Sequence, residues 1–131
     1  MKIEEHEKAY NEHLRNINKF VEEGIEENQR NVGYNISQGS VELFSILMHK
    51  LNLIEGSGDQ FDHRIFKNKN LIEKKIPLGF SKRVELLNLM RDIETNRNVL
   101  CYGTRKPLKR IEEAIIKFNE LRKLINSIIL K

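Results

Sequence analysis

The stretch Glu94-Thr95-Asn96-Arg97-Asn98-Val99-Leu100-Cys101-Tyr102-Gly103 decides how the rest of the chain is interpreted. Apolar residues leading into it recur at intervals of four, three and seven, at Leu86, Met90, Ile93 and Leu100. This spacing predicts one face of an α-helix. Arg97 falls on the same face, where an arginine is unfavourable unless it meets a counter-charge, a cleft or a second chain. Arg97 is therefore the first candidate functional residue.

The end of this helix is marked by Gly103, a residue typical of helix C-termini, and by Pro107 shortly after it. Basic residues follow at once and form a candidate phosphate-binding group with Asn98 and Tyr102; they are Arg105, Lys106, Lys109 and Arg110. Cationic side chains at such a place favour contact with phosphates, which weakens as salt rises.

The rest of the chain has the same helical periodicity. It predicts helices over residues 2–28, 31–55, about 62–75 and 81–102, and a last one that starts at Pro107. Ser81 is expected to cap the fourth, and Glu55–Asp59 reads as a loop. The pattern indicates an all-α, up-and-down antiparallel bundle of four to five helices, forming a single domain over residues 1–131. Small residues in the first half of the second helix are expected to permit close packing.

Composition limits the class of protein. Charged residues make up 32% of the 131 residues, and there is a single cysteine, Cys101, which excludes an internal disulfide. No run of 18 apolar residues and no secretory signal is present, so we expect a cytoplasmic protein without a membrane partner. Residues 1–60 have a net charge of −5 and residues 61–131 one of +9. Either the second half presents a basic face to phosphates, or the two halves neutralise each other across the bundle or a dimer.

Metal and cofactor sites are not expected. His6 and His13 are seven residues apart without a third ligand nearby, so we interpret them as surface or boundary residues. Paired Glu-x-x-His motifs of di-metal bundles and glycine-rich phosphate loops are absent. Cys101 is interpreted as a core or interface thiol rather than a nucleophile.

The motif around Arg97 resembles that of the HEPN superfamily (higher eukaryotes and prokaryotes nucleotide-binding domain). The family motif is Arg, usually followed by a polar residue, then His after four to six intervening residues. Here Arg97 and Asn98 match the first two positions, and Tyr102 stands where the family has His. The resemblance covers most of the chain in architecture but only these positions in residues.

The resemblance implies a homodimer that brings two copies of the motif into one cleft, and metal-independent RNA cleavage by Arg and His in the active members. Arg would stabilise the charge of the transition state, and His would transfer a proton. Other members bind without cleaving, or pair with a small nucleotidyltransferase. Tyr102, with a pKa normally about 10, is a poor general base at neutral pH.

Two functions therefore remain open. The preferred hypothesis is a dimeric RNA-binding or nucleotide-binding module with an altered motif, and the alternative is a ribonuclease that uses Arg97 and Tyr102 as catalytic residues. A structural role for Arg97 is the third interpretation, with Glu94 or Glu42 as its ion-pair partner. Of the four histidines, His49 is the one expected to lie nearest the cleft.

Overall fold

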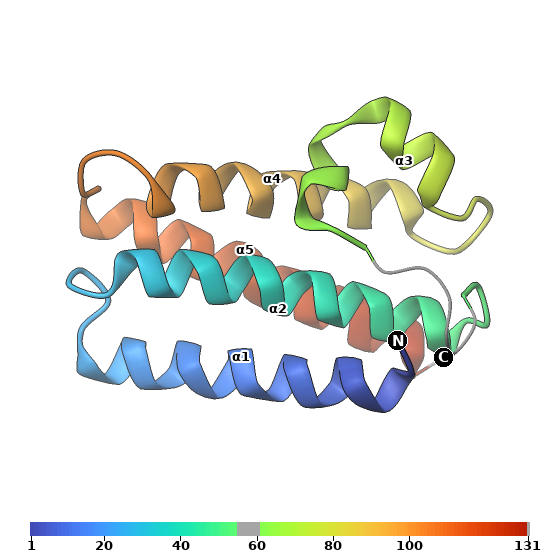
Figure 1. Cartoon of the computed structure of the whole chain (residues 1–131), viewed down its shortest axis with the longest axis horizontal. Coiled ribbons are helices and arrows are strands. Elements are labelled where there is room, and N and C mark those ends of the chain that lie inside the picture. Colours follow the sequence, from blue (N-terminus) through green and yellow to red (C-terminus); the bar gives the residue numbers. More distant parts are fainter. Residues whose placement is uncertain (55–60, 131) are drawn as a thin grey trace.

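A computed structural model describes residues 1–54 and 61–130, and all regular structure within them is helical. Four long helices alternate in direction (Figure 1): α1 (Ile3–Glu23), α2 (Gln29–Lys50), α4 (Arg83–Cys101) and α5 (Leu108–Ile129). Between α2 and α4 lie the short 3-10 helix η1 (His63–Lys67) and α3 (Lys69–Lys75). The expected all-α bundle is confirmed. None of the described helices is long and apolar enough to cross a membrane.

Helix α2 is the central element, because it packs against each of the other three long helices. Its small residues permit this contact, as the sequence predicts. A Cβ atom at Gly33 would lie 2.8 Å from Leu100 Cβ, and one at Gly39 would lie 3.3 Å from His13 Cβ. Real Cβ atoms are almost never as close as the first distance, so Gly33 is required for the packing of α4 on α2.

The core contains the apolar stripe that surrounds Arg97. All four of its members are buried, namely Leu86, Met90, Ile93 and Leu100. They pack with residues of α2 and α5, including Phe44 and Phe118. The face of α4 on which Arg97 lies is therefore turned toward the bundle, as its spacing predicts.

Several predicted boundaries are wrong for local reasons. The first helix ends at Glu23 and not at residue 28, because Gly24 has a φ of 125° and breaks the helical conformation. The segment 62–75 is two helices, because the Asn68 side chain accepts a hydrogen bond from Leu71 N and starts a new one. Ser81 does not cap α4. The N-cap residue is Lys82, whose backbone adopts a left-handed conformation, and the helix begins at Arg83.

The second helix is also shorter than expected, since α2 ends at Lys50. The loop predicted at Glu55–Asp59 lies outside the described residues. Asp62 caps η1, because its carboxylate accepts a hydrogen bond from Arg64 N at 2.8 Å.

Candidate functional site

Arg97 reaches from α4 to the surface of α2. Its Nη1 donates a hydrogen bond to Ser37 Oγ at 3.2 Å, and its guanidinium carbon lies 5.3 Å from the centre of the Tyr34 ring, a cation–π contact. Its Nε is buried and has no hydrogen-bond partner among the described residues. Of the five N–H donors of this guanidinium, the described residues accept from one.

The carboxylates expected to pair with Arg97 bind histidines instead. Glu94 accepts a hydrogen bond from His63 Nδ1 at 2.8 Å, and Glu42 accepts one from His6 Nδ1 at 2.6 Å. Arg97 forms no ion pair with any described residue. The interpretation of Arg97 as the ion-pair partner of Glu94 or Glu42 is therefore wrong. Glu94 precedes Arg97 by three positions but faces η1, whereas Arg97 faces α2.

Tyr34 contacts both Arg97 and a histidine of α1. Its side chain is 46% exposed, and the His13 ring meets it edge-on with ring centres 6.1 Å apart. Arg97 and His13 thus flank one aromatic ring, although they are 84 positions apart in the sequence. Helix α2 contributes the ring, and α1 and α4 contribute the two nitrogen-bearing side chains.

The protonation of His13 follows from its hydrogen bonds. Asn35 Nδ2 donates to the carbonyl of Asn31 at 2.8 Å, so Asn35 Oδ1 is the atom turned to His13. An amide oxygen only accepts, so His13 Nδ1, at 2.8 Å, must carry the proton. The neutral ring then has its lone pair on Nε2, which is a proton acceptor. The buried side-chain nitrogens that lack a hydrogen-bond partner among the described residues do not include His13 Nε2.

His49 does not approach this site, contrary to the sequence-based expectation. It lies twelve residues beyond Ser37 on α2, roughly 18 Å along the axis. Its ring centre is 5.4 Å from that of His6. His6 is buried, although the sequence predicted it at the surface or at the boundary of the core. Burial lowers the pKa of His49, and repulsion from His6 adds to this effect.

Tyr102 and Asn98, the other motif residues, are exposed. Helix α4 ends at Cys101, so Tyr102 follows it in an extended conformation with 63% of its side chain exposed. No hydrogen bond or aromatic contact joins Tyr102 to Arg97 among the described residues. The structure therefore brings Tyr34, and not Tyr102, into contact with Arg97.

Two of the four basic residues after the motif, Arg105 through its side chain and Lys106 through its backbone, hold the connection between α4 and α5 in place. Arg105 Nη1 donates to the carbonyls of Glu26 and Glu27, at 3.0 and 3.2 Å, and Lys106 N donates to Gln29 Oε1 at 2.9 Å. Lys109 is exposed. The predicted phosphate-binding group is thus partly a structural contact with the turn between α1 and α2.

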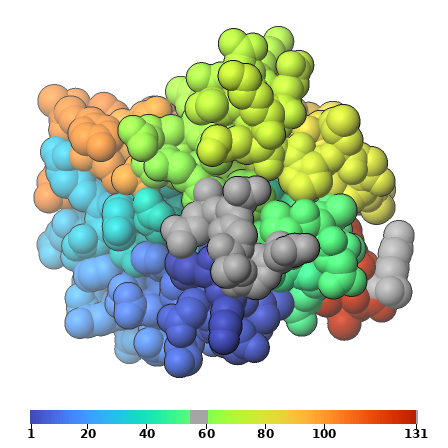
Figure 2. Space-filling model, turned by 45° about the vertical axis from the view of Figure 1, so that its right-hand side comes forward, coloured from blue at the N-terminus to red at the C-terminus, as the bar shows by residue number. Residues whose placement is uncertain are grey.

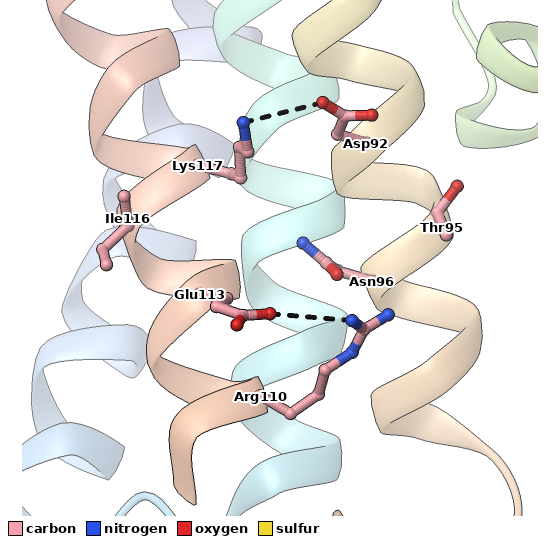
Figure 3. A pocket seen from close by; sticks show the side chains of 7 residues that line it. All are labelled: Asp92, Thr95, Asn96, Arg110, Glu113, Ile116 and Lys117. Carbon is pink, nitrogen blue, oxygen red and sulfur yellow. Dashed lines mark ion pairs between the residues drawn. The ribbon is translucent and has the colours of Figure 1, made fainter.

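Arg110, the remaining basic residue, lines an open groove between α4 and α5 with a volume of about 320 Å³ (Figure 3). Its Nη1 lies 3.6 Å from Glu113 Oε2, and Lys117 Nζ lies 3.7 Å from Asp92 Oδ2. Each cation in the groove faces a carboxylate, so the groove has no excess charge to attract a phosphate. Arg97 does not line it.

Cys101 has the properties of a structural thiol. Its Sγ lies 3.6 Å from the carbonyl oxygen of Arg30, to which it donates. Burial raises the pKa of the thiol, which disfavours the reactive thiolate. No group of three or more His, Cys, Asp or Glu side chains within residues 1–54 and 61–130 is arranged to hold a metal ion.

Sequence reasoning missed Tyr34, Ser37, His13 and Asn35. A weak signal exists, because Tyr34 and Ser37 are three residues apart and so share a helix face, where a tyrosine adjoins small residues.

Comparison of the chain with protein-family models, with curated proteins and with solved structures finds no match.

Proposed function

We propose that this chain is a HEPN-like module that binds single-stranded RNA or a nucleotide at Arg97. The observation that carries the proposal is the Arg97 guanidinium, which has no carboxylate partner among the described residues and lies against the half-exposed ring of Tyr34. A buried donor without an acceptor is unfavourable, and such departures concentrate at functional sites.

Phosphate is the ligand group that fits this cation. A guanidinium binds phosphate oxygens through charge-assisted hydrogen bonds, and Arg97 has donors left for them. A partly exposed tyrosine provides a surface on which an unpaired base can stack, at about 1–3 kcal/mol per base. Single-stranded RNA offers both groups, since its bases are free to leave the stack.

Fluorescence anisotropy with a labelled 20-nucleotide single-stranded RNA tests the proposal at two salt concentrations. We expect Arg97→Ala to weaken binding at least tenfold while remaining folded by circular dichroism. Arg91→Ala is the matched control, because Arg91 is an exposed arginine on the same helix. Equal affinity of the two folded variants would overturn the proposal.

Metal-independent RNA cleavage is the second candidate function, and the observation that favours it is the tautomer of His13. In this reaction His13 Nε2 would take the proton of a 2′-hydroxyl, the 2′-oxygen would attack the phosphorus, and Arg97 would stabilise the added negative charge. The P–O5′ bond breaks, and the leaving oxygen takes a proton from water.

A cleavage assay in excess EDTA separates the two possible proton acceptors. Cleavage that is lost in His13→Ala and kept in Tyr102→Phe would support the role of His13. Cleavage lost in Tyr102→Phe alone would support the sequence-based assignment of Arg97 and Tyr102. If the wild-type protein binds RNA but does not cleave it under the same conditions, the ribonuclease hypothesis is excluded and the binding-module hypothesis is retained.

The proposal includes a cytoplasmic homodimer, with a small nucleotidyltransferase as a further partner. Exposed apolar side chains support a second chain, since Ile116 on α5 and Leu130, which follows the end of α5, lie at the surface. Sedimentation equilibrium tests it, and a monomer at every concentration would exclude the homodimer.

A further inference from the structure

One short segment of this protein has a large net positive charge, apart from the basic group at residues 105–110 described above. Residues 61–83 contain seven Lys or Arg and two Asp or Glu, a net charge of +5. The whole chain has a net charge of +4, so the residues outside this segment together have a charge of −1. The segment comprises η1, α3 and the connection to α4. Its charge is therefore a local feature and does not reflect a basic protein as a whole.

Four lysines account for most of this excess, because the other cations of the segment have partners. Arg64 pairs with Asp62 at 2.9 Å, Lys82 pairs with Glu85 at 3.5 Å, and Arg83 Nε donates to the carbonyl of Pro77 at 2.8 Å. The remaining four are exposed and form no ion pair with any described residue; they are Lys67, Lys69, Lys74 and Lys75.

These lysines stand on a part of the molecule that projects from the bundle. Helix α3 packs against η1 and against no other described helix, and none of its residues is buried. Figure 2 shows this segment, in yellow-green, raised above the surface of the long helices. Lysines that serve packing lay their stems along apolar surface. Here Leu71 and Ile72 of α3 pack against the core, whereas the four lysines are exposed, so packing does not account for their charge.

The projection also adjoins the Arg97 site. His63 of η1 contacts Glu94, which precedes Arg97 by one turn of α4. A groove of about 390 Å³ lies between η1 and α3, lined by the apolar Ile65 and Leu71, by Asn68 and Lys75, and by the Asp62–Arg64 ion pair. The groove and Lys75 therefore lie on the part of the molecule that His63 joins to α4.

We propose that Lys67, Lys69, Lys74 and Lys75 form a second binding surface, for the phosphate backbone of a nucleic-acid strand. The surface is separate from Arg97, and it takes a chain of several phosphates, which a mononucleotide lacks. Because lysines contact phosphate as point charges, this surface contributes affinity and not base recognition. Counterions released from the strand make this contribution strongly salt-dependent.

The test is the salt dependence of binding measured by fluorescence anisotropy. The probes are a labelled 20-nucleotide single-stranded RNA, a DNA duplex of 20 base pairs and the dinucleotide UpU. The variant replaces all four lysines by glutamine. The matched control replaces four exposed lysines elsewhere by glutamine, which changes the net charge equally; they are Lys2, Lys8, Lys19 and Lys123. Circular dichroism and denaturation midpoints confirm that both variants are folded.

For the single-stranded RNA we expect the slope of log K against log salt to fall by up to about 3 in the variant, roughly 0.7 for each phosphate that a lysine no longer neutralises. The control should keep the wild-type slope, and UpU binding should be unchanged in both. An equal change in variant and control, or an unchanged slope in the variant with both the RNA and the DNA duplex, overturns the proposal. A reduced slope with duplex DNA alone assigns the surface to DNA.

The outcome is independent of the Arg97 site. If Arg97→Ala binds RNA with the wild-type slope and the lysine variant does not, the second surface stands and the proposed function at Arg97 fails. If the lysine variant binds vesicles of anionic lipid less well than wild type but binds both nucleic acids normally, the proposal is overturned in favour of a membrane surface. Absence of nucleic-acid binding by the wild-type protein overturns both proposals.

Discussion

His63 and Glu94 join η1 to α4 through a largely buried contact, in which His63 Nδ1 lies 2.8 Å from one carboxylate oxygen of Glu94 and 2.9 Å from the other. Glu94 is only 4% exposed, so this carboxylate depends on His63 for its hydrogen bonding. The contact has two consequences. It attaches the basic projection to the bundle, and it directs the nearest carboxylate on α4 away from Arg97.

Glu94→Ala is expected to lower the free energy of unfolding by about 2 kcal/mol, because it removes a buried partner of His63 and leaves a polar ring without an acceptor. Urea denaturation measures the change. Glu112→Ala, at an exposed position of α5, is the control and should change stability little. Equal stability of the two variants would show that the His63–Glu94 contact contributes nothing to the fold.

Stability is expected to fall as the pH drops below about 6.5, through His49. Burial lowers the pKa of His49 in the folded protein, and His6 lowers it further, whereas the Met1 carbonyl and Glu4 act in the opposite direction. The unfolded chain then binds more protons than the folded one, so acid favours unfolding. Urea midpoints at pH 7.5 and 5.5 should differ less in His49→Leu than in wild type. The same difference in both proteins would contradict this role.

Gly33→Ala is expected to destabilise the bundle by about 1–3 kcal/mol, since the added Cβ would lie 2.8 Å from Leu100 Cβ and 3.3 Å from Cys101 Sγ. The first of these atoms is next to the backbone and cannot move away alone. Gly39→Ala is the comparison, because its nearest neighbour is at 3.3 Å. In thermal denaturation, Gly33→Ala should unfold at a lower midpoint temperature than Gly39→Ala. The reverse order of midpoints would exclude close packing of α4 on α2.

Arg30→Ala is expected to lower the free energy of unfolding by about 1 kcal/mol. Arg30 donates to the carbonyls of Cys101 and Gly103, the second at 2.9 Å, so its cation stabilises the C-terminal end of α4. Arg15→Ala removes an exposed arginine from α1 and serves as control. Denaturation midpoints that fall equally in both variants would contradict the capping role.

Local patterns predicted much of the fold and part of the candidate site. The apolar spacing from Leu86 to Leu100 correctly placed Arg97 on the inward face of its helix, since a helical period depends only on neighbours in the chain. The boundaries were less accurate. Gly24 ends α1 because it adopts a positive φ, and the sequence alone does not distinguish this from a glycine inside a helix.

The partners of the charged residues were not predictable in the same way. Glu94 stands three positions from Arg97, which is a suitable spacing for an ion pair, yet it binds His63. His49 was expected near the motif, but it lies about three turns beyond Ser37, the residue of α2 that Arg97 contacts. Spacing within one helix says which side chains share a face, but the neighbouring element decides which of them meet.

The sequence by itself determined an all-helical chain, the inward position of Arg97 and the concentration of positive charge after residue 60, because each depends on residue type and local spacing. Only the tertiary structure decided that Arg97 meets Tyr34 and Ser37, the latter 60 positions earlier, and that His13 flanks the same ring. The physical reason is that helix packing depends on the shapes of whole surfaces, such as the gap left by Gly33 and Gly39, and these surfaces join residues far apart in the chain.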